Sequence, residues 1–145
     1  DFSQGVIDLA KENSKSIEAE VDFECSDVLQ KRPFEPQCFD AVVSNPPYIP
    51  AHEKTNMESR VADCEPLSAL FVPNNDPLLF YTRIIALCEG GLLNPGGWLA
   101  FECHTRFATD VADLFRGAKT RWDKISLIKD LQGKPRHVFA RIDLT

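Results

Sequence analysis

The stretch that decides the fold is Phe39-Asp40-Ala41-Val42-Val43-Ser44-Asn45-Pro46-Pro47-Tyr48, in which an apolar run stops at two prolines. Residues 39–44 are rich in apolar and β-branched side chains, a pattern typical of a short buried strand. Proline cannot donate a backbone hydrogen bond to a sheet, so the prolines end the strand in an extended turn. The sequence therefore predicts a strand with Asn45 and Tyr48 at its carboxyl end, where open α/β sheets bind their ligands.

The residues after this strand suit a planar amino group. Asn45 Oδ1 and the carbonyl of Pro46 can accept its two hydrogens, and the ring of Tyr48 can stack on its plane. An amide nitrogen is a weak nucleophile because its lone pair is delocalised into the carbonyl. Holding both N–H groups orients that lone pair, and such positioning can lower the barrier by several kcal/mol without a metal. The alternative is an ordinary turn, since Asn-Pro is a common turn dipeptide.

Composition narrows the class of protein. The chain has 145 residues, 43% of them hydrophobic, and a net charge of −6, which suits one domain with its own core. The mixed, acidic charge pattern argues against a nucleic-acid partner, which would need a basic stripe. We expect no membrane association, because no apolar run is long enough to span a bilayer and no signal peptide opens the chain. The five cysteines and three histidines show no ligand spacing, so we expect reduced thiols, a cytoplasmic location and no metal.

Helix and strand signals alternate along the chain, as in α/β proteins. The expected helices run from Ser3 to about Asn13, from Asp76-Pro77 to near Gly90-Gly91, and from Ala108 to Arg116. The expected strands are Val21–Cys25, Phe39–Ser44, Trp98–Glu102, Ile125–Asp130 and Arg136–Ile142. The last two strands form a hairpin, so we expect a mainly parallel sheet with an antiparallel edge.

Apolar spacing also assigns core positions. On the helices these are Val6, Leu9 and Ala10, then Leu79, Phe80, Ile84 and Leu87, then Val111, Leu114 and Phe115. In the strand that follows the turn Asn94–Gly97, Trp98 and Phe101 are expected in the core. The connection from Tyr48 to Asn75 shows no convincing helix or strand, and we interpret it as a lid or recognition surface over the motif. The alternative is a disordered excursion.

Four motifs, in this order and spacing, resemble one family. They are Ser44-Asn45-Pro46-Pro47-Tyr48-Ile49, Val61-x-x-x-Glu65-Pro66-x-x-Ala69-Leu70, Leu93-x-Pro95-Gly96-Gly97-x-Leu99-x-x-Glu102 and Asp130-Leu131-x-Gly133-x-x-Arg136. Together they resemble the release factor glutamine methyltransferases, the HemK/PrmC family of class I S-adenosylmethionine-dependent enzymes. The first motif is shared with adenine-N6 methyltransferases, and the second and fourth narrow the resemblance to this family.

The resemblance implies a partial class I (Rossmann-like) methyltransferase sheet, with residues 1–145 as the carboxyl-terminal part of a single catalytic domain. The family's strand order is 3-2-1-4-5-7-6, and the first two strands with their glycine-rich loop have no counterpart in these residues. The helical amino-terminal domain that usually engages the substrate protein has none either. We therefore expect this fragment alone to bind cofactor weakly or not at all, and to be inactive.

The resemblance also implies roles for individual residues. Asp1 would bind the ribose hydroxyls of S-adenosylmethionine, and Asp27 with Val28 would border its adenine, with Asn45 close to the reacting methyl group. Asn45, Pro46, Pro47 and Tyr48 would bind the substrate amide, with Asn45, Pro46 and Tyr48 in the catalytic role. Glu65 would order the long connection against the site. For Asp27 the alternative is a turn-forming residue, and for Glu65 a solvated carboxylate.

The function implied is N5-methylation of a protein glutamine, in the Gly-Gly-Gln loop of a peptide-chain release factor. Two alternatives stay open, namely N6-adenine methylation of DNA or RNA, in which the exocyclic amine would be flipped into the same grip, and a noncatalytic fragment. Two segments depart from the family pattern. Cys103-His104-Thr105-Arg106-Phe107 stands where a glycine and a glutamine are usual, and Asp76-Pro77-Leu78 replaces Asp-Gly-Leu.

Overall fold

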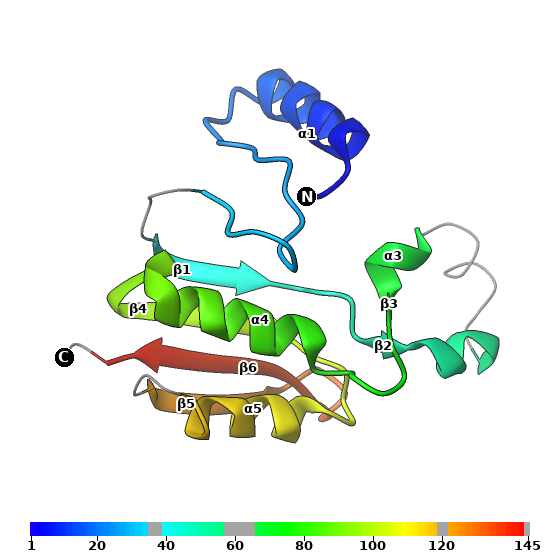
Figure 1. Ribbon diagram of the computed structural model, residues 1–145, viewed down its shortest axis with the longest axis vertical. Coiled ribbons are helices and arrows are strands. Elements are labelled where there is room, and N and C mark those ends of the chain that lie inside the picture. The colour runs from blue at the N-terminus through cyan, green and yellow to red at the C-terminus, as the bar shows by residue number, and fades with distance from the viewer. Residues whose placement is uncertain (35–38, 57–65, 119–121, 144–145) are drawn as a thin grey trace. The chain divides into compact units, whose positions relative to one another are not determined.

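The computed structural model describes residues 1–34, 39–56, 66–118 and 122–143, which fall into two compact units (Figure 1). The first unit is Asp1–Gln37 and the second is Cys38–Thr145. In these ranges no helix combines the length and the apolar character needed to cross a membrane. The expectation that residues 1–145 form part of a single domain stays a prediction.

In its described residues, 1–34, the first unit contains one helix, α1, over Gln4–Ser16. Ser3 stands at its N-cap with an extended backbone, as expected, although its side chain makes no capping hydrogen bond. The backbone N–H of Ser3 instead donates to Oδ1 of Asp1 at 2.8 Å. A carboxylate at the amino end of a helix is favourable, because the unpaired N–H groups there carry partial positive charge.

The buried face of α1 differs from the predicted one. Ile7 is the buried residue of the helix, whereas Val6 and Leu9 are 47% and 57% exposed. The chain after the helix returns along the face that continues from Ile7, where Oγ of Ser14 donates to the carbonyl of Ala19 at 2.6 Å. The predicted face is therefore wrong, because the returning chain selects which side of the helix is covered.

The predicted strand Val21–Cys25 is wrong, because the structure shows this segment without strand structure. A strand needs a neighbour with which it exchanges backbone hydrogen bonds. Around this segment the first residue supplies only isolated links: the amino group of Asp1 donates to the carbonyl of Glu24 at 3.2 Å, and Ser26 N–H donates to the carbonyl of Asp1 at 2.7 Å. These contacts close a loop but do not make a ladder.

A four-stranded sheet in the order β1-β4-β6-β5 forms the centre of the second unit (Figure 1). Its strands are β1 Phe39–Ser44, β4 Leu93–Glu102, β5 Trp122–Lys129 and β6 Pro135–Ile142. β1 and β4 are parallel, and β6 is antiparallel to both β4 and β5. The mixed α/β class, the bounds of β1 and the terminal hairpin are thus confirmed. The observed order also agrees with the last four positions of the order expected from the resemblance.

β1 is less buried than its apolar sequence predicts. Among the described strands it pairs with β4 alone and so lies at an edge of the sheet. Val43 is 80% exposed, although it lies in the middle of the apolar run. The expectation of a buried strand is therefore wrong in this structure, since only one of its edges carries a neighbour.

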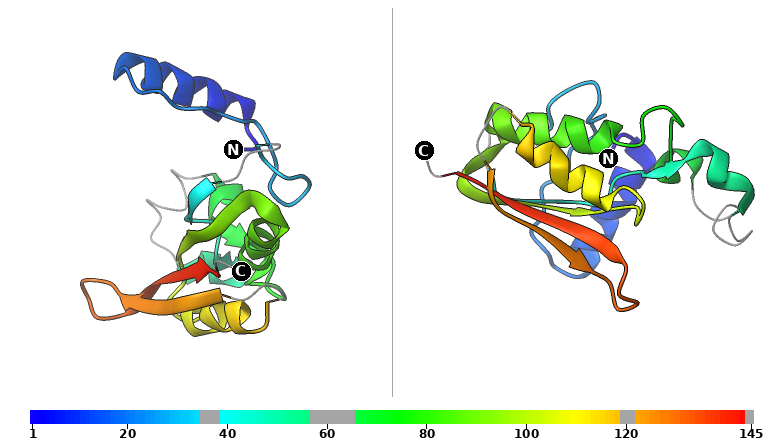
Figure 2. Two further views of the ribbon diagram at one scale, coloured as in Figure 1. Left: turned by 90° about the vertical axis from the view of Figure 1, so that its left-hand side faces the viewer. Right: turned by 90° about the horizontal axis from the view of Figure 1, so that it is seen from below.

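Two helices, α4 over Leu79–Leu87 and α5 over Ala108–Arg116, lie on the same face of this sheet (Figure 2). The bounds of α5 are as predicted. α4 begins later than predicted, because Asp76 lies in a turn before the helix. The carbonyl of Asp76 accepts a hydrogen bond there from the N–H of Leu79 at 3.4 Å. At its other end α4 continues into a short π-helical turn, η2 Cys88–Leu92, in which Gly91 takes a φ of 91°.

The core of the second unit lies between these helices and the sheet. Alternate residues of β4 and β6 point into it, as expected for strands with one covered face. The residues buried there on these strands are Leu99, Phe101, Val138, Ala140 and Ile142. From the helices come Tyr81, Ile84, Ile85, Leu87, Val111, Ala112 and Phe115. Phe101 is at the centre, with its ring 5.1 Å from that of Tyr81 and 6.2 Å from that of Phe115.

Trp98 does not belong to this core, and that prediction is wrong. It is 40% exposed, with the ammonium group of Lys124 lying 6.0 Å from its ring centre. Trp98 has the opposite parity to Leu99 and Phe101 on β4, so it points to the other face of the sheet. The prediction for Phe101, which is 1% exposed, is confirmed.

β4 begins at Leu93 rather than Trp98, and the predicted turn lies inside it. Phe39 of β1 pairs with Leu93 and Ala41 pairs with Trp98, so the ladder shifts register between them. Gly96 has a φ of 80°, and a Cβ on Gly97 would meet the carbonyl of Asn94 at 2.9 Å. The glycines therefore form a bulge that lets the strand start early.

The connection after the motif contains short elements that the sequence did not reveal. In its described parts these are β2 Ile49–Pro50, η1 Ala51–Asn56, α3 Leu67–Leu70 and β3 Phe71–Val72. β2 and β3 pair in parallel, and Val72 is 2% exposed. The expectation that this connection has no helix or strand is wrong for these residues, because elements of two to six residues are too short to show a period.

Candidate functional site

The Asn45–Tyr48 motif lies where β1 ends, at the carboxyl edge of its sheet. Asn45 is exposed and Pro46 is buried. Ser44 pairs with Phe101 of the parallel strand β4, so Glu102 ends β4 at the same edge. Parallel pairing therefore brings together two segments that lie far apart in the sequence, and the site contains residues from both.

Tyr48 and Glu102 are joined directly. The Tyr48 hydroxyl donates to Oε1 of Glu102 at 3.0 Å. Burial of the phenol raises the pKa of Tyr48, and the Glu102 carboxylate raises it further, whereas the guanidinium of Arg136 acts in the opposite direction. The neutral phenol is thus favoured, and its hydroxyl serves as a hydrogen-bond donor to a carboxylate.

Glu102 is held by its backbone as well. Its carbonyl accepts from the hydroxyl of Tyr81 at 3.1 Å, and the residue pairs with His137 of β6. Tyr81 is fully buried, and burial raises the pKa of its phenol. Glu102 therefore projects from the end of a central strand rather than from a loop.

The Asp130–Arg136 motif closes the hairpin between β5 and β6. Oδ1 of Asp130 accepts from the N–H groups of Gln132 and Lys134 at 2.9 and 3.0 Å, and Oδ2 lies 3.4 Å from Nε of Arg136. These bonds hold the pKa of Asp130 below its usual value, and the bond from the Lys134 N–H has the largest effect. Gly133, with a φ of 79°, allows the turn. The turn is structural, and it directs Arg136 toward the carbonyl of Cys103 at 3.5 Å.

A second cluster ties the connection after the motif to the segment after β4. Oε1 of Glu53, in η1, accepts from Arg106 at 2.9 Å, and its Oε2 lies 3.3 Å from Nε2 of His104. The His104 ring also meets the edge of the Tyr48 ring, with centres 6.1 Å apart and an angle of 69°. The centre of the His104 ring also lies 5.4 Å from that of the Phe107 ring. We name Glu53, His104 and Arg106 the Glu53 cluster.

Sequence reasoning missed the Glu53 cluster. It treated His104 and Arg106 only as departures from a family pattern, and it assigned Glu53 no role. A signal was present in the sequence, since a His-x-Arg sequence begins two residues after Glu102, where a strand ends at the predicted ligand edge. The partner carboxylate could not be identified, because it lies on a connection without a readable period.

Three of the residues predicted to bind the cofactor, Asp1, Asp27 and Val28, lie in the first unit, and the fourth, Asn45, lies in the second. Oδ1 of Asp1 accepts from Ser3, and Oδ1 of Asp27 accepts from Leu29 N–H at 2.9 Å. Val28 is half-buried. The hydrogen bond from Leu29 is what the turn-forming alternative for Asp27 expects. The role of Asp27 in cofactor binding stays a prediction. Glu65 lies outside the described residues.

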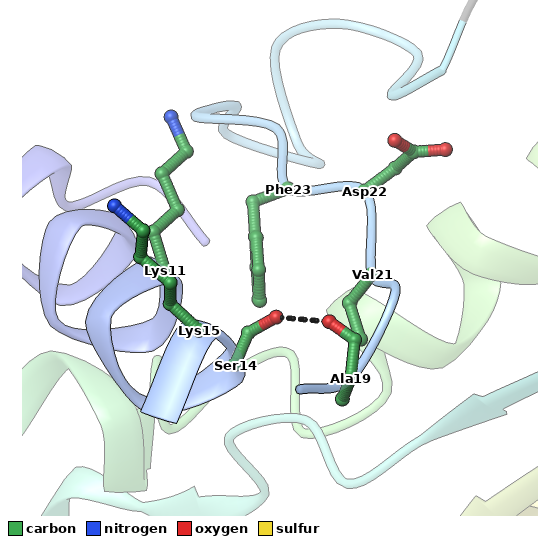
Figure 3. Close-up of a pocket in the computed structure, with 7 residues that line it drawn as sticks. All are labelled: Lys11, Ser14, Lys15, Ala19, Val21, Asp22 and Phe23. Carbon is green, nitrogen blue, oxygen red and sulfur yellow. Dashed lines mark hydrogen bonds between the residues drawn. The ribbon is translucent and has the colours of Figure 1, made fainter. Parts of the chain in front are cut away.

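A hollow of about 430 Å³ lies within the first unit, between α1 and the chain that returns past it (Figure 3). Figure 3 shows the side chains of Lys11 and Lys15 on its helical side, and Asp22 and Phe23 opposite. The Ser14–Ala19 hydrogen bond crosses its base. The hollow contains none of the predicted site residues.

The two buried cysteines among the described residues, Cys88 and Cys103, are unsuited to thiolate chemistry. Cys25, Cys88 and Cys103 are free, and burial raises the pKa of Cys88 and of Cys103 to about 12. A thiol of that kind stays protonated, which disfavours both nucleophilic attack and metal ligation. In the same ranges no three His, Cys, Asp or Glu residues are grouped as metal ligands.

Curated relatives match the chain over nearly all of its length. It is 39% identical to the release factor glutamine methyltransferase of Bacteroides thetaiotaomicron over 140 residues, which are 97% of this chain and 49% of that protein. It is 36% identical to the enzyme of that name from Bacillus anthracis over 143 residues, which are 99% of this chain and 50% of the relative. It is 34% identical to the enzyme of that name from Flavobacterium psychrophilum over 138 residues, which are 95% of this chain and 47% of the relative.

No protein-family model matches the chain. The curated relatives agree with each other in name, and the chain spans about half the length of each. The motif at the end of β1, its partner strand β4 and these matches converge on one conclusion. By sequence the chain is similar to the release factor glutamine methyltransferases, of which it spans about half.

Proposed function

We propose that this chain is part of an enzyme that transfers a methyl group from S-adenosylmethionine to the side-chain nitrogen of a protein glutamine. The substrate is the Gly-Gly-Gln loop of a peptide-chain release factor, which places the enzyme in the cytoplasm, where translation ends. The relatives' names support the release factor as substrate. The observation that carries the proposal is the exposed Asn45 beside Pro46 at the carboxyl end of β1.

The motif holds the amide in three ways. Asn45 Oδ1 and the Pro46 carbonyl accept one N–H each, which turns the nitrogen lone pair out of conjugation with the carbonyl. The Tyr48 ring covers the amide plane and excludes water from one side. Pro46 has no N–H of its own, so nothing on that residue competes for the amide hydrogens.

Carboxylates suit the ribose of the cofactor, because each accepts hydrogen bonds from hydroxyl groups. Asp1 is exposed and Asp27 half-buried, and the structure gives one oxygen of each a backbone partner. We propose that Asp1 binds the ribose hydroxyls, that Asp27 and Val28 border the adenine, and that Asn45 lies beside the methyl group. S-adenosylmethionine supplies that methyl group on an electrophilic sulfonium. The glycine-rich loop and the first two strands of the fold would come from outside these 145 residues.

The experiment measures transfer of labelled methyl from S-adenosylmethionine to a release factor, with the full protein that contains this chain. Asn45→Ala should lower kcat by about 10²- to 10³-fold, the range for loss of one preorganised polar group. A release factor with Ala in place of the loop glutamine should take no label. Asn94→Ala is the matched control, because Asn94 lies at the amino end of β4, the end away from the motif, where its side chain donates to Oδ1 of Asp40. It should keep normal transfer.

Other outcomes would identify other functions. Label on added DNA or RNA, but not on protein, would favour the adenine alternative, in which the same grip holds an exocyclic amine. Label on neither substrate would contradict the proposal and favour a noncatalytic protein.

A further inference from the structure

We propose that Glu102 is a positioning residue of this site: its carboxylate holds the Tyr48 hydroxyl and so orients the Tyr48 ring beside Asn45. The inference rests on the proposed function, because the orientation of the ring matters only where it covers a substrate. Glu102 itself makes no contact with substrate in this proposal. It acts through Tyr48.

The geometry limits the Tyr48 ring at two places. Its hydroxyl is held by Oε1 of Glu102 at 3.0 Å, and its edge meets the ring of His104 at 69°. An aromatic side chain has two rotatable bonds, so contacts at the far end and at the edge are enough to select one rotamer. Tyr48 lies in a segment without regular structure, where its backbone alone would fix the ring poorly.

Glu102, by contrast, is attached to a rigid part of the fold. It is the last residue of β4, pairs with His137, and its carbonyl accepts from the fully buried Tyr81. A catalytic group on a loop is held best by a partner on a regular element. The Tyr48–Glu102 hydrogen bond therefore fixes the Tyr48 side chain, which lies on a loop, to the end of a central strand.

The charge of Glu102 adds a second effect. A carboxylate that accepts from a phenol keeps the ring neutral and rich in electrons, and an aromatic face attracts positive charge. Methyl transfer to an amide nitrogen moves positive charge from sulfur toward nitrogen. An oriented, neutral Tyr48 would favour that redistribution, while its ionised form would lose the bond to Glu102.

The first test observes Tyr48 directly and needs no substrate. In full-length protein labelled with ¹³Cζ-tyrosine, Tyr48→Phe identifies the Tyr48 resonance. Glu102→Ala should move that resonance and bring its titration to lower pH, because the carboxylate that raises the pKa of Tyr48 is gone. Asp123→Asn is the matched control, since it removes a carboxylate that pairs with Arg141, at the end of β6 away from the Glu102–His137 pair. It should leave the Tyr48 resonance in place.

The second test measures methyl transfer by the same variants. Glu102→Ala should lower kcat about 10-fold or more, the factor for a hydrogen bond to a charged group, with KM for S-adenosylmethionine unchanged. Glu102→Gln keeps an acceptor and should restore part of the rate. Tyr48→Phe combined with Glu102→Ala should be no slower than the slower single variant, since both remove one bond.

The outcomes separate this inference from the proposed function. An unchanged Tyr48 resonance in Glu102→Ala would overturn the inference, whatever the activity. A moved resonance with normal kcat, or additive losses in the double variant, would overturn it as well. A wild-type protein that shows the Tyr48–Glu102 coupling but methylates no glutamine would contradict the proposed function and leave the contact standing.

Discussion

The two units of this protein hold their chains together in different ways. In the second unit, hydrogen-bonded strands carry alternating side chains into one core, and Leu99, Val138 and Ala140 are fully buried there. In the first unit, Ile7 is the buried hydrophobic residue among those described, and turns and single bonds connect the rest. The difference shows that an apolar segment becomes a strand only where a second segment lies alongside it.

The largest effect is expected in the core of the second unit. Phe101→Ala removes a ring packed against Tyr81 and Phe115, and the loss of a buried aromatic side chain costs about 3–5 kcal/mol of unfolding free energy. Denaturant unfolding of the full protein, followed by amide exchange in β4 and β6, measures it. Val43→Ala, at a residue 80% exposed, is the control and should change stability by about 0.5 kcal/mol or less. Equal losses in both variants would contradict the placement of Phe101 in the core.

A smaller, local effect is expected in the first unit. Ile7→Ala should destabilise α1 by about 2 kcal/mol, the low end for a buried isoleucine, because few neighbours surround it. Amide exchange should speed up in α1 and stay unchanged in β4 and β6. Leu9→Ala, at a residue 57% exposed, serves as the control with little change. If exchange in β4 and β6 sped up equally, the two units would not differ in the way described.

The Glu53 cluster should contribute less. Glu53 is 22% exposed and pairs with Arg106 and His104, whereas Asp113 and Arg116 form a pair in which both side chains are more than half exposed. Glu53→Gln should cost about 1 kcal/mol and speed amide exchange in η1, since paired groups near the surface contribute modestly. Asp113→Asn should have no measurable effect. If Asp113→Asn lowered the unfolding free energy more than Glu53→Gln did, the exposure of a pair would not determine its contribution to stability.

The smallest effect concerns two carboxyl groups, one in each unit. Backbone N–H groups are the first cause that lowers the pKa of both, Phe34 for Glu24 and Lys134 for Asp130. A pKa that is lower in the folded state means stability that is present above the unfolded-state value and lost as the pH falls through the folded one. Both contributions should therefore begin to decrease as the pH falls below about 4 and should be lost once the pH is below the folded-state pKa of each group. Carboxyl ¹³C titration should give values below those of model peptides, and Asp130→Asn should remove the acid dependence of the hairpin. Carboxyl pKa values equal to those of model peptides would contradict the hydrogen bonds from Phe34 to Glu24 and from Lys134 to Asp130.

The predictions held where prolines, turn residues or a clear apolar period lie within the element or next to it. The bounds of β1 and α5, the β5–β6 hairpin and the burial of Phe101 were predicted correctly. Turn residues and periodicity carry this information locally. The wrong burial predictions share one cause, because Val6, Val43 and Trp98 are apolar residues whose burial depends on which neighbour covers them.

For the site, the sequence alone identified the Asn45–Tyr48 motif, the strand before it and the family that the chain resembles. It could do so because prolines, an amide and an aromatic residue act within one short segment. Only the tertiary structure decided that Glu102 bonds to Tyr48 and that Glu53 lies against His104 and Arg106. Those pairs depend on β1 and β4 lying side by side in register, a long-range pairing that local sequence patterns do not encode.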